Sequence, residues 1–155
     1  MTKIFTYILL FISTFSFSQA NKTIKDTSFK KGDIIKVSDI YFALDDRGHR
    51  NDSSYKIIAD FLSSHKNLIV EIGSHTDTRG KATNNYTLSC VRAKYMRDEL
   101  ISRFNIDSNQ VKFKGYGITK VIKSDLEISK AKTKQEKEEL HQINRRMELK
   151  VLFVK

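Results

Sequence analysis

A loop aspartate and a helical arginine are the residues of this sequence best suited to chemistry. Asp77 follows an apolar run that ends at Ile72, and Arg92 lies further along, one helical turn after Leu88. Because Arg92 borders the apolar side of its segment, its guanidinium is expected to face protein rather than open solvent. A carboxylate accepts an ammonium group, and a guanidinium binds a carboxylate through two parallel hydrogen bonds. The pair suits two roles equally: a clamp for a zwitterionic amino acid, or an internal ion pair that ties loop to helix.

A phosphate-binding loop is excluded at the same place. Such a loop needs four residues between its glycines and a Ser or Thr after its Lys. Here six residues separate Gly73 from Gly80, and Ala82 follows the lysine. Asp77 would also repel a phosphate.

Catalysis and metal binding have little support. The histidines show no paired ligand spacing, and they stand at positions His49, His65, His75 and His141. Cys90 precedes Val91 in an apolar helical segment, where a lone cysteine usually packs against its neighbours. His75 is expected to hold the loop by hydrogen bonds. We therefore expect no enzyme activity, no metal and no cofactor.

The first twenty residues have the layout of a secretory signal peptide. After Lys3, an apolar and hydroxyl run extends from Ile4 to Phe17, and the small residues Ser18 and Ala20 follow. A membrane-spanning helix needs about twenty apolar residues, so we favour cleavage after Ala20, with a retained anchor as the alternative. The chain has 28 Lys and Arg against 18 Asp and Glu, which favours anionic partners. Export disfavours nucleic acid and leaves cell-wall carboxylates or lipid head groups.

Beyond residue 20 the pattern alternates between strands and helices. We expect a linker over 21–33 and one domain over 34–155. The expected elements are strands at 34–42, 68–72, 111–116 and 145–154, and helices at about 52–62, 84–104 and 125–142. Their order predicts helices packed on a mixed four-stranded sheet, an α/β (α+β) sandwich. In the second helix the apolar stripes are Leu88, Val91, Tyr95 and Met96, Leu100, Phe104. The Lys and Glu of the third helix suggest a solvated face.

Several motifs in order resemble the OmpA-like peptidoglycan-binding domains, the group that includes the C-terminal domain of OmpA, Pal and MotB. The resemblance extends over about residues 34–154. The matching residues are His75-Thr76-Asp77, Gly80, Asn85, Leu88-Ser89, Arg92-Ala93, Gly115-Tyr116-Gly117, Asn144-Arg145-Arg146 and Glu148, with a looser match at Ile40-Tyr41-Phe42 and Asp45. The sequence departs from the family pattern at Ala43, where Asp is usual, at Ser74, where Gly is usual, and in a longer, more charged segment over 123–141.

The resemblance implies a periplasmic α/β sandwich that binds peptidoglycan without covalent chemistry, through the diaminopimelate of the stem peptide. It assigns the diaminopimelate contacts to Asp77 and Arg92. Further ligand contacts are expected from Thr76, Asn85, Phe42, Asn144 and Arg145. Outer-membrane association fits the same family. Two alternatives remain: an envelope protein-interaction module that has lost its ligand, and, with less support, a cell-wall hydrolase.

Overall fold

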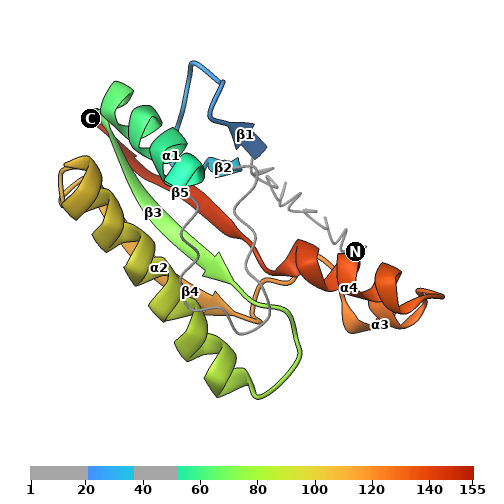
Figure 1. The fold of residues 1–155 in the computed structure, drawn as a ribbon. Coiled ribbons are helices and arrows are strands. Elements are labelled where there is room, and N and C mark those ends of the chain that lie inside the picture. The colour runs from blue at the N-terminus through green and yellow to red at the C-terminus, as the bar shows by residue number, and fades with distance from the viewer. Residues whose placement is uncertain (1–20, 37–51) are drawn as a thin grey trace, which may run out of the picture.

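The computed structural model describes residues 21–36 and 52–155 of the chain. Its elements follow one another in the order β1 (Asn21–Thr23), β2 (Ile34–Lys36), α1 (Asp52–Ser64), β3 (Leu68–His75), α2 (Ala82–Phe104), β4 (Val111–Gly117), α3 (Asp125–Ser129), α4 (Lys134–Asn144) and β5 (Met147–Val154). The strands form one mixed sheet in the order β1-β2-β5-β3-β4, in which β3 runs parallel to β4 and antiparallel to β5. α1 and α2 cover one face of the sheet, while α3 and α4 lie beyond the end of β3 (Figure 1).

The apolar core fills the space between the sheet and the two long helices. In α1, the residues at helical spacing, Tyr55, Ile58, Ala59 and Leu62, are all buried. They join buried side chains of β3, β5 and α2 in one cluster. Burial of each large apolar side chain contributes about 1.5–3 kcal/mol, so this cluster is the main source of stability.

A close contact between α2 and β4 sets the position of the second helix. A Cβ atom on Gly115 would lie 2.4 Å from the backbone nitrogen of Cys90 and 2.5 Å from Ser89 Oγ. Ser89 Oγ also accepts the N–H of Gly117 at 2.9 Å. Only glycine at position 115 allows this approach, and the approach fixes the rotation of the helix that carries Arg92.

The expected fold class is confirmed, but over residues 21–36 and 52–155 the sheet has five strands rather than four. The segment 21–33, expected as a linker, contributes β1, which pairs in parallel with β2. Phe29 packs edge-on against Phe61 at a centroid distance of 5.4 Å, and Gly32 donates its N–H to the Val151 carbonyl. These contacts come from distant parts of the chain, so the polar local sequence gave no sign of them. Of the expected strand 34–42, β2 accounts for Ile34–Lys36, and the remainder lies outside the described residues.

The charged segment expected as one helix forms two. Ser124 caps α3 and Thr133 caps α4, each in a capping box with the glutamate three residues later, Glu127 and Glu136. Each box satisfies backbone donors at a helix start, so the chain begins a new helix at residue 134.

The first expected stripe on α2 is wrong at Val91, whereas Tyr95 of the same stripe packs against the core. Val91 is 42% exposed, whereas Ser89, Arg92 and Ala93 are buried together with Met96 and Leu100. At the contact with Gly115, the small Ser89 faces β4 in place of a larger side chain, because the close approach leaves no room for one.

Candidate functional site

The carboxylate of Asp77 lies at the end of β3 and is held by two arginines. Asp77 is 2% exposed. Its Oδ2 atom accepts hydrogen bonds from Arg79 Nη2 at 2.6 Å, Arg79 Nε at 3.1 Å and Arg145 Nη1 at 2.6 Å. Its Oδ1 atom accepts the backbone N–H of Arg79 at 3.1 Å. The backbone therefore folds back onto Asp77 directly after β3, and Arg145, the C-cap residue of α4, approaches Asp77 from another part of the chain.

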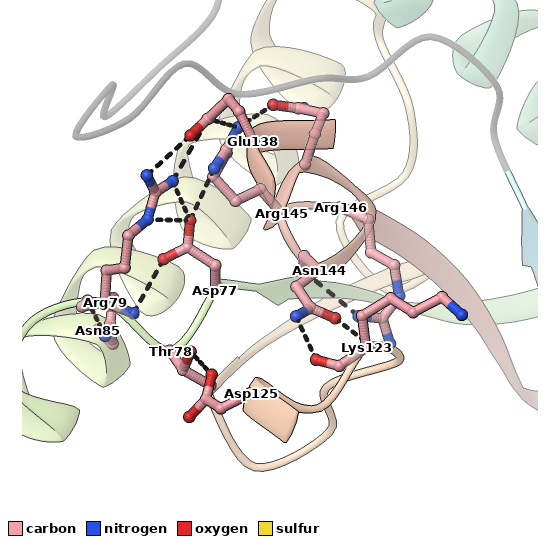
Figure 2. Close-up of polar contacts among 11 residues, drawn as sticks. Asp77, Thr78, Arg79, Asn85, Lys123, Asp125, Glu138, Asn144, Arg145 and Arg146 are labelled. Carbon is pink, nitrogen blue, oxygen red and sulfur yellow. Dashed lines mark hydrogen bonds and ion pairs between the residues drawn. The ribbon is translucent and has the colours of Figure 1, made fainter. Parts of the chain in front are cut away.

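Glu138 of α4 completes this network from the surface. Its carboxylate accepts from Arg79 Nη1 at 2.8 Å and from Arg145 Nη2 at 2.7 Å. Figure 2 shows the resulting ring, in which two carboxylates and two guanidinium groups alternate. The charges of these four groups cancel.

The ring keeps Asp77 ionised at neutral pH. Burial alone would raise the pKa of Asp77, but hydrogen bonds from Arg79 and Arg145 outweigh burial and hold the pKa below its usual range. The pKa of Glu138 is lowered as well, first by its hydrogen bond from Arg79. Hydrogen bonding to Asp77 raises the pKa of Arg79.

Arg92 reaches the same site from α2. Its side chain is almost fully buried, at 1% residue exposure. It lines a cavity of about 730 Å³ that also reaches the loop after β3. The lining residues are Thr76, Asp77, Arg79, Gly80, Lys81, Asn84, Asn85, Thr87, Leu88, Val91, Arg92 and Arg145.

The structure brings most of the residues predicted for the site to this cavity. Asp77, Arg92, Thr76, Asn85 and Arg145 all line it. Asn85 holds the loop by donating from Nδ2 to the Arg79 carbonyl at 2.8 Å. Within the described part of the chain, Thr76 Oγ1 is buried and has no hydrogen-bond partner, so a ligand group could satisfy it.

Two predicted residues are not placed there. Asn144 is fully buried and is not among the lining residues. Its Oδ1 atom accepts the backbone N–H groups of Ile122 and Lys123, both at 2.8 Å, and its Nδ2 donates to the Lys123 carbonyl at 2.7 Å. Asn144 thus joins the end of α4 to the chain before α3 (Figure 2). Phe42 lies outside the described residues.

His75 has a role in positioning the strand end. Its ring is fully buried and stacks on Tyr116 with a centroid distance of 4.8 Å, and its Nε2 lies 3.3 Å from Glu148 Oε2. Burial lowers the pKa of His75, so the imidazole is neutral at pH 7. Its backbone N–H donates to the Arg146 carbonyl at 3.0 Å, and this hydrogen bond fixes the position of the end of β3 relative to the start of β5.

Arg79 and Glu138 were not predicted from the sequence. An Asp followed two residues later by an Arg in a loop is compatible with a local ion pair, and this signal could have identified Arg79. Glu138 offers no local signal, because it stands among other Lys and Glu residues of a helix. The interpretation of that helix as only a solvated face is wrong at Glu138, which contacts the site.

The cavity is positively charged and suited to carboxylates. Arg79, Lys81, Arg92 and Arg145 line it, and Asp77 is the acid among its lining residues. Arginine groups bind carboxylates in bidentate fashion, and their charge persists at any physiological pH. Because Asp77 and Glu138 balance Arg79 and Arg145, the excess positive charge of the lining comes from Lys81 and Arg92, which suits a ligand that carries a carboxylate.

Comparison with known proteins decides the family. The model of the OmpA family matches residues 50–137, more than half of the chain. The chain belongs to the OmpA family. Over 94 residues it is 28% identical to outer membrane porin F of Pseudomonas aeruginosa, a match that covers 58% of this chain and 27% of the porin. The chain therefore spans only about a quarter of the length of that OmpA-family relative.

Solved structures show the same OmpA-like fold. The cell wall anchor of the T6SS from Pseudomonas aeruginosa is 26% identical with a TM-score of 0.58, over 79% of this chain and 80% of that one. The periplasmic domain of Helicobacter pylori MotB gives 21% identity and a TM-score of 0.59, over 82% and 86%. The peptidoglycan-associated lipoprotein of Burkholderia pseudomallei is 20% identical with a TM-score of 0.54, over 73% of this chain and 86% of that one. Among the residues described for this OmpA-family chain, none of the helices has the length and apolar character needed to cross a bilayer.

Proposed function

We propose that this chain binds peptidoglycan without covalent chemistry, through the diaminopimelate of the stem peptide, and so holds its carrier at the cell wall. The observation that carries the proposal is the meeting of Asp77 and Arg92 at one cavity, on an OmpA-family fold. The cell wall anchor and the peptidoglycan-associated lipoprotein among its structural neighbours support it.

The side-chain end of diaminopimelate carries one carboxylate and one ammonium. The carboxylate pairs with the Arg92 guanidinium, whose planar fork of N–H donors matches carboxylate geometry. The ammonium meets Asp77 Oδ1, which accepts one hydrogen bond, from the Arg79 N–H, among the described contacts and has a further lone pair. Thr76 Oγ1 is available as an additional polar partner.

This arrangement distinguishes diaminopimelate from lysine. A lysine-type stem keeps the ammonium but lacks the second carboxylate, so the charge-assisted hydrogen bonds to Arg92 are lost. Removal of one such interaction from a buried site costs about 2–5 kcal/mol. Lysine-type stems should therefore bind much more weakly.

The electrostatics favour binding over hydrolysis. A general acid must hold a proton near neutral pH, and the lowered pKa of Asp77 keeps that carboxylate ionised. Asp77 therefore does not suit the general acid of a hydrolase, and we assign the domain a tethering role. The apolar leader over residues 1–20 supports export. A periplasmic location with outer-membrane association fits both this leader and the proposed binding to peptidoglycan.

Co-sedimentation of the purified protein with isolated peptidoglycan tests the proposal. Diaminopimelate-type peptidoglycan should bring the protein into the pellet in a saturable manner, and lysine-type peptidoglycan should leave it in the supernatant. A folded protein that stays in solution with both would overturn the wall-binding function, and cross-linking in the envelope would then search for a protein partner.

A further inference from the structure

The ring around Asp77 has an inner and an outer half. In the inner half, the side chains of Asp77 and Arg145 are 3% and 4% exposed and their charged atoms lie 2.6 Å apart. In the outer half, Glu138 is 50% exposed and Arg79 is 35% exposed, with 2.8 Å between their charged atoms. Buried pairs are costly to break, whereas half-exposed pairs contribute little because water and salt replace the partners easily. Glu138 is therefore the exchangeable member of the ring.

Glu138 approaches the arginines on a separately anchored piece of the chain. The Thr133 capping box fixes the start of α4, and Asn144 fixes its end through the backbone of residues 122 and 123. Thr78 also donates a hydrogen bond to Asp125 at the start of α3. These contacts hold α4 at the rim whether or not the Glu138 carboxylate stays on the arginines.

The two guanidinium groups that Glu138 binds also line the cavity, whereas Glu138 does not. Among the described residues, Arg79 and Arg145 bind the carboxylate of Asp77, which belongs to the buried wall, and the carboxylate of Glu138, which comes from the rim. A carboxylate that enters through the cavity can take the second place without disturbing the first.

We propose that Glu138 is a built-in competitor that occupies a second carboxylate position of the site, formed by Arg79 and Arg145. The inference rests on the proposed function and extends it. The ligand places one carboxylate on Arg92 and a second on the arginine pair, and the Glu138 side chain moves into solvent. The neighbouring glutamyl residue of the stem peptide, with its free α-carboxylate, is the group we assign to this second position.

Isothermal titration calorimetry of the full protein with a diaminopimelate-containing muropeptide tests the competition. Glu138→Gln keeps the shape of the side chain but removes the competing charge, and it should bind about three- to tenfold more tightly than wild type. Glu139→Gln is the matched control, because Glu139 lies next to Glu138 on α4 and accepts its hydrogen bond from Gln135 of the same helix. Its affinity should equal that of wild type.

A second ligand identifies the carboxylate. With the same muropeptide amidated at the glutamyl carboxylate, the gain from Glu138→Gln should disappear. Weaker binding by folded Glu138→Gln, or affinity equal to that of Glu139→Gln, would overturn the competitor role and assign Glu138 to positioning of the arginines. If wild type binds and only these comparisons fail, the wall-binding function stands without the competitor. If no variant binds either muropeptide, the proposed function fails and the inference fails with it.

Discussion

Arg145 Nη1 lies 2.6 Å from Asp77 Oδ2, although 68 residues separate the two in sequence. Both side chains are nearly buried, so the pair joins the loop after β3 to the C-cap of α4 inside the protein. The site therefore forms only when β5 has paired with β3 in the sheet. The fold and the geometry of the cavity therefore depend on the same contact.

Replacement of Asp77 by Asn should destabilise the fold. The change removes a buried negative charge and leaves Arg145 with fewer anionic partners, at a cost of about 3 kcal/mol in the free energy of unfolding. Urea denaturation of wild type and Asp77→Asn measures this loss of unfolding free energy. The matched control is Asp60→Asn, which breaks an exposed ion pair with Lys56 and should cost less than about 1 kcal/mol. An equal loss of unfolding free energy in the two variants would show that the buried ion pair stabilises the fold no more than the exposed one does.

Stability should fall in acid through Glu148. Burial disfavours its charge, but hydrogen bonds from His75 and Arg146 outweigh burial and lower the pKa of Glu148 to about 2 from a reference of 4.5. Because the folded pKa is the lower one, the ionised form stabilises the fold above pH 4.5, and this contribution is lost as pH falls toward 2. The contribution of ionised Glu148 to the free energy of unfolding is about 3 kcal/mol.

The measurement is the difference in unfolding free energy between wild type and Glu148→Gln as a function of pH. The difference should be constant above pH 7, where His75 is neutral in both proteins, and should shrink as pH falls from 4.5 toward 2, because the other carboxylates are common to both proteins. A difference that does not change with pH would mean that Glu148 contributes through shape rather than charge.

Replacement of Gly115 by Ala should push α2 away from β4. The added Cβ would meet the backbone nitrogen of Cys90 at 2.4 Å, and a backbone atom cannot move aside as a side chain can. Overpacking of this kind costs about 1–3 kcal/mol or more. Because Arg92 lies on the same helix, the Gly115→Ala variant should also bind muropeptide more weakly.

The control for this prediction is Gly32→Ala, where a Cβ would meet nothing within 4 Å and only the positive φ of 95° is strained. It should cost about 1–2 kcal/mol without an effect on muropeptide affinity. A loss of affinity in Gly32→Ala as large as that in Gly115→Ala would contradict the link between this contact and the site.

Removal of the α4 cap should loosen the rim without unfolding the core. Thr133 Oγ1 accepts the backbone N–H of Glu136 at 3.0 Å, and loss of such a cap costs about 1 kcal/mol. In Thr133→Ala, amide hydrogen exchange should accelerate at the start of α4, while β3 and β5 keep wild-type protection. Uniform acceleration across the sheet would contradict an independent α4.

Some patterns within single elements were predictable from the sequence. The helical spacing of apolar residues identified the buried face of α1. The four residues of this face are all buried: Tyr55, Ile58, Ala59 and Leu62. The family motif placed Asp77 and Arg92 at one site, because it records spacing that a common fold requires, and both line the cavity.

Relationships between distant segments were not predictable. β1 has a polar sequence, and its pairing with β2 comes from the sheet rather than from its own residues. Glu138 looked like one more exposed charge, since only the packing of α4 brings it to Arg79 and Arg145. The partners of Asp77 depend on such placements, so the sequence alone could not separate a ligand clamp from an internal ion pair.

Calorimetric titration with diaminopimelate-type and lysine-type muropeptides tests the central claim most directly, with wild type beside Arg92→Lys. Lysine keeps the charge but loses the bidentate fork, and equal thermal unfolding would show that the variant is folded. We predict saturable binding of wild type to the diaminopimelate ligand, at least about tenfold weaker binding to the lysine ligand, and a similar loss in Arg92→Lys. Equal affinity of wild type for both ligands, or unchanged affinity in folded Arg92→Lys, would contradict recognition of the stem through Arg92.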